Sequence, residues 1–161
     1  MPEIYILRHG DAEKRRAGLA DADRALTPKG KRDLRRVIRA AKAGMDAPLL
    51  VLSSPLRRAR ETAALVVAVY PGCPLVVTDR LKPAGDPKSL WKEACNDAQR
   101  SRVVLIGHEP QLGHLVAFLL ESPVAVDFKK GGLIRIDTPE RLGPPRGVLK
   151  WMLTPKLARA N

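Results

Sequence analysis

The sequence is poor in aromatic residues, which make up 4% of its 161 positions. Hydrophobic residues still account for 45% of the chain, so we expect a core filled by aliphatic side chains. This balance excludes a disordered or collagen-like chain. The length is that of one compact domain, and we expect a single domain over residues 1–161, with a polar tail after about residue 154.

Cysteines and long apolar runs are also scarce. Cys73 and Cys95 are far apart and form no CxxC pair, which argues against a disulfide framework and against a zinc site built on cysteines. No apolar run approaches the roughly 18 residues of a membrane span, and the first residues lack the pattern of a signal peptide. We therefore expect a protein of the reducing cytoplasm that does not enter membranes.

Acidic residues are few relative to basic ones, 17 against 29, which gives a formal net charge of +12. Such a surface attracts phosphates, nucleic acids or acidic protein faces. Basic charge alone gives only salt-sensitive, unspecific binding to nucleic acid, and the sequence has no stacking platform of aromatic residues. We expect no specific nucleic-acid partner. A non-catalytic module that binds polyanions remains a remote alternative.

Short apolar segments alternate with amphipathic ones along the chain. Thr27 and Ser54 each stand where a helix N-cap is expected, and the helix after Ser54 is apolar nearly all round beyond Thr62, so we expect it to be well buried. Alternation of this kind produces right-handed β-α-β crossovers. The sequence predicts a three-layer α/β/α sandwich with a mostly parallel central sheet. The expected strands are 4–7, 48–52, 75–77, 103–106, 133–136 and 148–153, with a turn at 143–145, and the expected helices are 28–43, 54–70, 89–99 and one beginning at residue 110.

One face of the expected helix 28–43 is strongly basic. We interpret this face as solvated, and a docking surface for something acidic is the alternative. Its six cationic residues are Lys31, Arg32, Arg35, Arg36, Arg39 and Lys42.

Three polar clusters directly follow expected strands: Arg8-His9-Gly10, residues 53–58, and Gly107-His108-Glu109. Ligands of open parallel sheets bind beyond the carboxyl ends of the strands, so all three clusters can face one crevice. Two imidazoles and at least two guanidiniums there, without a group of carboxylates, suit a dianionic phosphoryl group better than a metal ion.

These residues carry a family resemblance. The segments LRHG, SSPLRRARETA and IGHEPQLG resemble the histidine phosphatase superfamily, which is named for its Arg-His-Gly motif. The segments DAE at 11–13, LTPKG at 26–30 and KKGG at 129–132 are similar to the SixA-type phosphohistidine phosphatases within it. The resemblance covers about residues 3–152 and implies a phosphoglycerate mutase-like fold.

The chemistry of phosphoryl transfer assigns roles to these residues. His9 is the expected nucleophile, and its ordinary pKa of about 6.5 leaves a neutral population at physiological pH. Arg8 and Arg58 are expected to bind the phosphoryl oxygens, and His108, if protonated, to add a third positive charge. No metal ion or cofactor is then needed. In the family pattern the arginine directly precedes an alanine, which selects Arg58 and leaves Arg57 as the secondary candidate.

Other polar residues near these motifs have simpler interpretations. Asp11 and Glu13 could orient His9, but we favour salt bridges within the basic loop. His114 lies off the motifs on an expected helix and is interpreted as structural. Lys129 and Lys130 are interpreted as a solvated turn near the mouth of the crevice.

The region after the third strand departs from the wider superfamily. Many members have an acid there that protonates an alkoxide leaving group, whereas this sequence has Pro83 at the aligned position. A phosphorylated imidazole can be protonated beforehand, so the substitution favours phosphohistidine as substrate. Asp79 or Asp86 could still supply the acid, which keeps a broad phosphatase for small phosphate esters as the alternative.

The short chain leaves no room for a long insert that closes over the site. An open, basic rim suits phosphohistidine displayed on a protein. The resemblance implies a histidine-containing phosphotransfer domain of a signalling system as the substrate. The oligomeric state is not predicted.

Overall fold

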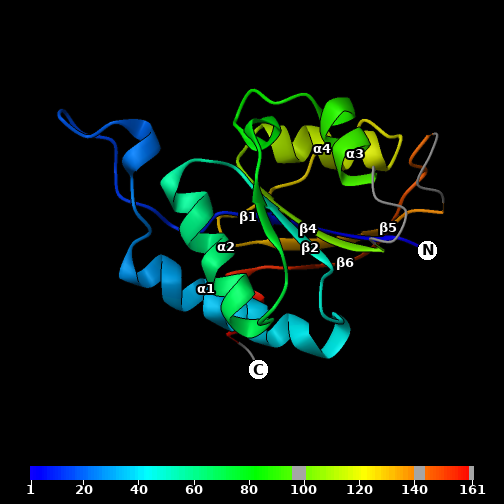
Figure 1. Cartoon of the computed structure of the whole chain (residues 1–161), viewed down its shortest axis with the longest axis horizontal. Helices are drawn as coiled ribbons and strands as arrows, with labels where there is room; N and C mark the ends of the chain where they lie inside the picture. The colour runs from blue at the N-terminus through cyan, green and yellow to red at the C-terminus, as the bar shows by residue number, and fades with distance from the viewer. Residues whose placement is uncertain (96–100, 140–143, 160–161) are drawn as a thin grey trace.

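A computed structural model describes residues 1–95, 101–139 and 144–159 and shows a central sheet with helices on both faces (Figure 1). The expected three-layer α/β/α sandwich is confirmed. The strands are β1 (Glu3–Arg8), β2 (Leu50–Ser53), β3 (Leu75–Val77), β4 (Arg102–Gly107), β5 (Leu133–Asp137) and β6 (Val148–Leu153). The helices are α1 (Pro28–Ala41), α2 (Arg57–Val69), α3 (Pro87–Cys95), α4 (Gln111–Leu119) and α5 (Pro155–Ala158), with 3-10 turns at Asp21–Asp23, Lys42–Gly44 and Asp79–Leu81.

The strands follow the order β3-β2-β4-β1-β5-β6. The first four run parallel, whereas β5 and β6 are antiparallel to their neighbours. The register pairs Arg8 with Gly107 and Ser53 with Ile106, so β1, β2 and β4 end side by side. Because β5 runs the opposite way, its first residue, Leu133, pairs with Leu7 at the same edge. Four chain segments therefore meet at one end of the sheet.

The core forms two layers, one on each face of the sheet. Leu34 and Val37 of α1 and Val66 of α2 pack on one face. Leu90 of α3 and Leu112 of α4 pack on the other, and Figure 1 shows these helix pairs on opposite sides of the strands. The core is mainly aliphatic, as the composition predicts, because β1 and β4 are covered on both faces and carry apolar residues throughout their buried length.

Helix α2 differs from the prediction in two ways. It begins at Arg57 after Leu56, which provides no side-chain cap, so the predicted N-cap role of Ser54 is wrong. The Ser54 hydroxyl instead accepts a hydrogen bond from the Leu56 N–H at 3.3 Å and faces the strand ends. The helix is also not buried all round, since Ala64 and Ala68 are exposed on the side that turns away from the sheet.

The segment after Thr154 is a docked helix and not only a polar tail. The Thr154 hydroxyl caps α5 by accepting from the Leu157 N–H at 3.3 Å, and Ala158 is buried in the layer with α1. Two smaller differences are that α1 ends at Ala41 in a 3-10 turn and that β2 begins at Leu50. The predicted extension of α3 to residue 99 and part of the predicted turn at 143–145 lie outside the described residues.

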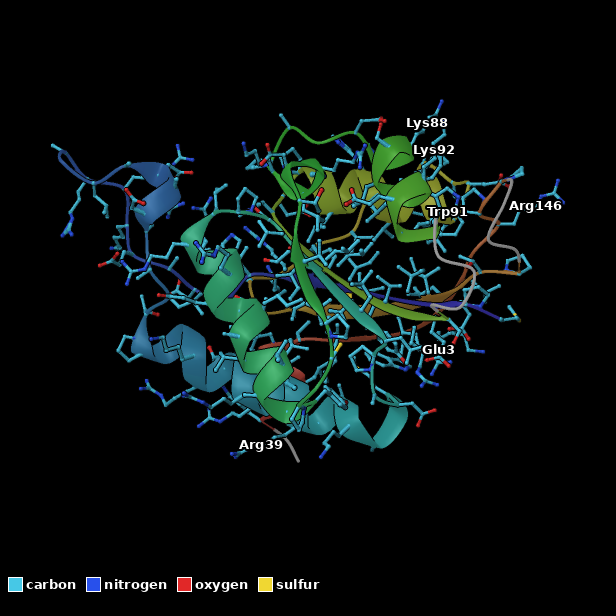
Figure 2. The ribbon with its side chains drawn as sticks, viewed as in Figure 1. Glu3, Arg39, Lys88, Trp91, Lys92 and Arg146 are labelled. Carbon is cyan, nitrogen blue, oxygen red and sulfur yellow. The ribbon has the colours of Figure 1, made fainter. Side chains whose placement is uncertain are left out.

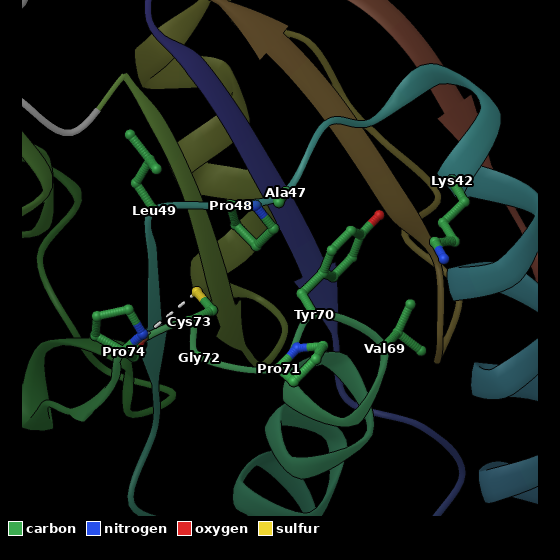
Figure 3. Close-up of a pocket in the computed structure, with 10 residues that line it drawn as sticks. All are labelled: Lys42, Ala47, Pro48, Leu49, Val69, Tyr70, Pro71, Gly72, Cys73 and Pro74. Carbon is green, nitrogen blue, oxygen red and sulfur yellow. Dashed lines mark hydrogen bonds between the residues drawn. The ribbon is translucent and has the colours of Figure 1, made fainter.

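Figure 3 shows a hollow at the amino ends of β2 and β3, with a volume of about 390 Å³. Tyr70, Cys73 and the prolines around them form its wall, and Lys42 is the only charged residue among the described lining residues. This hollow lies at the opposite end of the parallel strands from His9. Within the described ranges, no helix is long and apolar enough to cross a membrane.

Candidate active site

His9 directly follows the last residue of β1 and is 6% exposed. Its Nδ1 lies 2.7 Å from the carbonyl oxygen of Gly10. A carbonyl can only accept a hydrogen bond, so Nδ1 carries the proton and Nε2 of the neutral ring carries the lone pair. The Nε–H of Arg58 donates to this Nε2 at 3.3 Å. The imidazole is thus held in one tautomer, with its nucleophilic nitrogen toward a guanidinium.

Close packing around Gly10 fixes the direction in which the chain leaves β1. A Cβ atom at Gly10 would come within 2.6 Å of a Leu34 methyl group on α1, so glycine allows this approach. The Gly10 N–H donates to Thr62 Oγ1 at 3.3 Å, and the Thr62 hydroxyl donates to the carbonyl of Arg58 at 2.8 Å. The Thr62 hydroxyl therefore links the loop that carries His9 to α2 at the backbone of Arg58.

Arg58 and Arg57 occupy different environments although they are adjacent. The Arg58 side chain is 4% exposed, and it donates to the backbone carbonyl of Asp21 at 2.8 Å and to its carboxylate at 3.2 Å. The Arg57 side chain is 56% exposed and pairs with Glu61 at 3.0 Å. Successive helical residues point about 100° apart, so only one of the two reaches His9. The structure places Arg58 there, while sequence reasoning missed Asp21.

His108 directly follows β4 and is 2% exposed. The centre of its ring lies 4.9 Å from that of His9. Its Nε2 is hydrogen-bonded to Ser54 Oγ at 2.7 Å, and its Nδ1 is buried without a partner among the described residues. The two predicted histidines thus lie together, and the predicted cluster after β2 contributes Ser54 to one and Arg58 to the other.

Arg8 reaches the site from the end of β1. Its guanidinium donates to the carbonyl of Phe128 at 2.6 Å, and its Nε is buried with no partner among the described residues. The Gly131 N–H approaches the carbonyls of both Arg8 and His9, at 3.1 and 3.0 Å, from a backbone with φ of +73° that suits glycine. The turn before β5 therefore binds the backbone of Arg8 and His9. This turn lies at the carboxyl end of β1 because β5 runs antiparallel to β1.

Burial changes the titration of both histidines. It lowers the pKa of His9 to about 3, and the nearby His108 and arginines add to the effect. Burial and then the charge of Arg58 lower the pKa of His108 to about 4. Both imidazoles are neutral at pH 7 in this site. The neutral His9 expected from the sequence is therefore present, with a pKa below the ordinary value of about 6.5, and negative charge from a bound group would favour the protonated form of His108.

Asp11 and Glu13 do not contact His9 through a hydrogen bond or an ion pair in the described residues. Asp11 accepts from the Thr27 hydroxyl at 2.9 Å and forms a salt bridge at 3.2 Å, but its partner is Lys130 of the turn before β5 and not, as was predicted, a residue of the basic loop. Glu13 accepts from a backbone N–H at 2.9 Å and makes no such salt bridge in the described structure. His114 is exposed on α4.

The two alternative acids have other partners. Asp79 is 78% exposed and pairs with Lys82 at 3.1 Å. Asp86 caps α3, and hydrogen bonds from the backbone and hydroxyl of Ser89, both at 2.8 Å, lower its pKa. Gln111 donates to the carbonyl of Arg80 and so fastens this loop to α4. In the described ranges, His, Cys, Asp and Glu side chains form no group of three that could hold a metal ion.

Paired imidazoles and buried guanidiniums lie at the strand ends of this α/β/α sandwich, an arrangement whose positive groups suit a phosphoryl group. Residues 4–85 match the sequence profile of the histidine phosphatase superfamily (branch 1), and the chain belongs to this superfamily. An uncharacterized protein of Picosynechococcus sp. is 34% identical over 137 residues, which are 82% of each chain.

Solved structures agree with this assignment. The protein histidine phosphatase SixA complexed with tungstate is 26% identical, covers 96% of this chain and 97% of its own, and has a TM-score of 0.85. A putative phosphohistidine phosphatase SixA from Agrobacterium tumefaciens is 22% identical, with 95% and 97% covered and a TM-score of 0.81. A phosphoserine phosphatase from Entamoeba histolytica shares the fold at 16% identity, with 98% and 99% covered and a TM-score of 0.73.

Proposed function

We propose that this protein is a metal-independent phosphatase that removes the phosphoryl group from phosphohistidine on cytoplasmic signalling proteins. The observation that carries the proposal is the His9 tautomer, in which Nδ1–H is bound to the Gly10 carbonyl and Nε2 keeps its lone pair beside Arg58. This lone pair accepts the Arg58 N–H at 3.3 Å, and once a phosphoryl oxygen takes over that N–H, Nε2 can attack phosphorus without a separate base to activate it.

In the first step, Nε2 of His9 attacks the phosphorus and forms a P–N bond. The bond to the substrate imidazole breaks, and its electron pair stays on the departing nitrogen. Arg8 and Arg58 bind the equatorial oxygens, and the buried Arg8 Nε and His108 Nδ1 are further donors once His108 takes up a proton near the dianion. These groups supply the positive charge that a metal ion supplies in other phosphatases.

In the second step, water attacks the phosphorus of phospho-His9. The P–N bond breaks, its electron pair returns to Nε2, and the proton of the water passes to the released phosphate. His9 then regains the neutral tautomer that it began with, because the Gly10 carbonyl keeps the proton on Nδ1 throughout.

The loop around Pro83 supports phosphohistidine over an alkyl ester as substrate. An alkoxide leaves slowly unless an acid protonates it, whereas an imidazole that is already protonated leaves as a neutral molecule. Asp79 is exposed and paired with Lys82, and Asp86 is a helix cap with a lowered pKa, so neither is prepared to donate a proton.

A phosphatase for small phosphate esters is the second candidate, since a phosphoserine phosphatase shares the fold. The test compares kcat/KM for phosphohistidine or phosphoramidate with that for an unactivated alkyl phosphate, with and without a chelator. We expect the phosphoramidate to be faster by about 10²-fold or more, the usual contribution of a missing general acid, and the chelator to change neither rate. Efficient alkyl ester hydrolysis that is lost in Asp79→Asn or Asp86→Asn would establish the ester phosphatase instead.

A further inference from the structure

A second hollow lies beside the loop that carries His9. Its volume is about 530 Å³, and Gly10 and Asp11 of that loop form part of its wall. The remaining wall comes from the first turns of α1, the turn before β5 and helix α5. We call this hollow the flanking pocket. Its described lining residues are Gly10, Asp11, Lys29, Asp33, Lys129, Lys130, Thr154, Pro155, Lys156 and Arg159.

The flanking pocket is cationic, with five lysine or arginine side chains against two carboxylates in its lining, and Asp127 just outside the lining pairs with Lys129 at 2.7 Å. The carboxylates position part of this charge: Asp33, which is buried, holds Lys29 at 2.7 Å and Arg159 at 2.9 Å. The cationic side chains remain accessible, with Lys29 60% and Lys130 47% exposed. The wall therefore presents a positive surface to solvent directly beside the nucleophile's loop.

The positive surface continues along α1. Lys29, Arg32, Arg36 and Arg39 follow one another at spacings of three, four and three residues, which puts them on one side of the helix, and all four are exposed. Figure 2 shows Arg39 at the outer surface of this helix. Among the described residues, Arg32, Arg39 and Lys156 have no carboxylate within ion-pair distance. We call Lys29, Arg32, Arg36 and Arg39 the α1 stripe.

We propose that the flanking pocket and the α1 stripe bind an acidic segment of the protein whose phosphohistidine enters the active site. This inference rests on the proposed function and adds a second point of contact to it. Charge complementarity favours carboxylates as the occupants, because the cations are spread over more than one element and outnumber the acids. A single-stranded nucleic acid is less suited, since no aromatic side chain is among the described lining residues on which a base could stack.

The test uses two synthetic phosphohistidine peptides, one with glutamates on both sides of the phosphohistidine and one with glutamines at the same positions. The wild-type protein is compared with Arg32→Glu/Lys156→Glu, which reverses one charge of the stripe and one of the pocket. The matched control is Lys88→Glu/Lys92→Glu, which makes the same change of charge on α3, on the opposite face of the sheet in Figure 2.

We expect wild type and control to prefer the glutamate peptide by about tenfold in kcat/KM, mainly through KM, and the preference to shrink as salt is added. The Arg32→Glu/Lys156→Glu variant should lose the preference while keeping its kcat/KM for the glutamine peptide and for phosphoramidate.

Three results would overturn the docking proposal: equal rates of the two peptides with wild type, an unchanged preference in the variant, or an equal loss of preference in the α3 control. A failure of the proposed function is distinguishable from these, because the wild-type protein would then hydrolyse neither phosphohistidine peptide.

Discussion

Two groups of cations lie near the strand ends, and they differ in their surroundings. Arg58 in the active site has a 4% exposed side chain, held by both the carbonyl and the carboxylate of Asp21. Lys29 in the flanking pocket is 60% exposed and is held by one ion pair. The same formal charge therefore acts through a poorly solvated interior in one place and through water in the other.

The difference in exposure predicts different roles for the two groups of cations. Buried cations suit catalysis, and exposed cations suit the attraction of a charged partner. A buried guanidinium in fixed geometry interacts strongly with a phosphoryl oxygen and is little affected by salt, because water does not screen it. An exposed charge contributes about 0–1 kcal/mol per pair and is screened over about 10 Å at 0.1 M salt. Positive charge is abundant in this sequence, so burial and hydrogen-bond partners distinguish the cations proposed to be catalytic from the rest.

The largest effect should come from His9. We expect His9→Ala to reduce kcat/KM by at least about 10⁴-fold, because the variant lacks the nucleophile. Backbone pairing of β1 with β4 and β5 should preserve the fold, which circular dichroism would check. Alkaline quenching after incubation with a labelled phosphodonor should trap label on His9 in the wild type. Label on a serine, or normal activity of the variant, would exclude the covalent mechanism.

The adjacent arginines make the comparison sharper. Arg58→Ala should lower kcat/KM by about 10²–10³-fold, since it removes a buried donor to the phosphoryl oxygens. Arg57→Ala should change it by no more than about twofold, because that side chain is exposed and pairs with Glu61. The two variants serve as controls for each other in steady-state assays with phosphoramidate. Equal losses would show that burial beside His9 does not select the catalytic arginine.

Asp21 should have a smaller effect, through Arg58. Burial pushes the pKa of Asp21 up, but the charge of Arg58 and the hydrogen bonds from it and from Arg24 outweigh this and lower it. We expect Asp21→Asn to reduce kcat about tenfold, with little change in stability, because Arg58 keeps its bond to the backbone carbonyl. Asp21→Glu should recover part of the rate if the carboxylate positions Arg58. Full activity of Asp21→Asn would remove this role.

The last expected effect concerns stability and not catalysis: the free energy of unfolding should depend on pH. The folded pKa values of His9 and His108, about 3 and about 4, lie below the unfolded value of about 6.5. The unfolded chain therefore binds more protons, and stability present above pH 6.5 should be lost as the pH falls toward 4, by about 1.4 kcal/mol per pH unit for each histidine.

Urea denaturation between pH 7 and pH 4.5 would measure the slope of the free energy of unfolding against pH. His108→Asn should reduce this slope by the contribution of about one proton, which is about 1.4 kcal/mol per pH unit. A slope that does not change in this variant would mean that His108 titrates normally in the folded protein.

The fold was predictable because the apolar segments are short and each is followed by a turn signal. Buried strands such as β4 show as continuous apolar runs, and parallel pairing of β1, β2 and β4 brings their carboxyl ends together. The positions of His9 and His108 follow from that topology. The prediction for Ser54 was wrong because serine is a common N-cap residue before a helix. In the structure its hydroxyl is hydrogen-bonded to His108.

Long-range contacts and burial were not predictable. Asp21 lies 37 positions from Arg58 in a loop that has no periodicity, and the carbonyl of Phe128 that holds Arg8 has no side-chain signal. The lowered pKa values of the histidines depend on how completely the surrounding elements exclude water. A sequence motif identifies the residue types of a site, whereas neighbours from distant segments determine their protonation and orientation.

The antiparallel direction of β5 has a consequence for how such a site can change. The connection from α4 to β5, residues 120–132, reaches the active site as it approaches a strand, whereas the other contributing loops leave strands. It provides the Phe128 carbonyl, the Gly131 N–H and two of the four lysines of the flanking pocket, Lys129 and Lys130, but no nucleophile. Exchanging this single connection would alter the surface that meets the substrate while leaving the phosphoryl-transfer residues on separate parts of the chain.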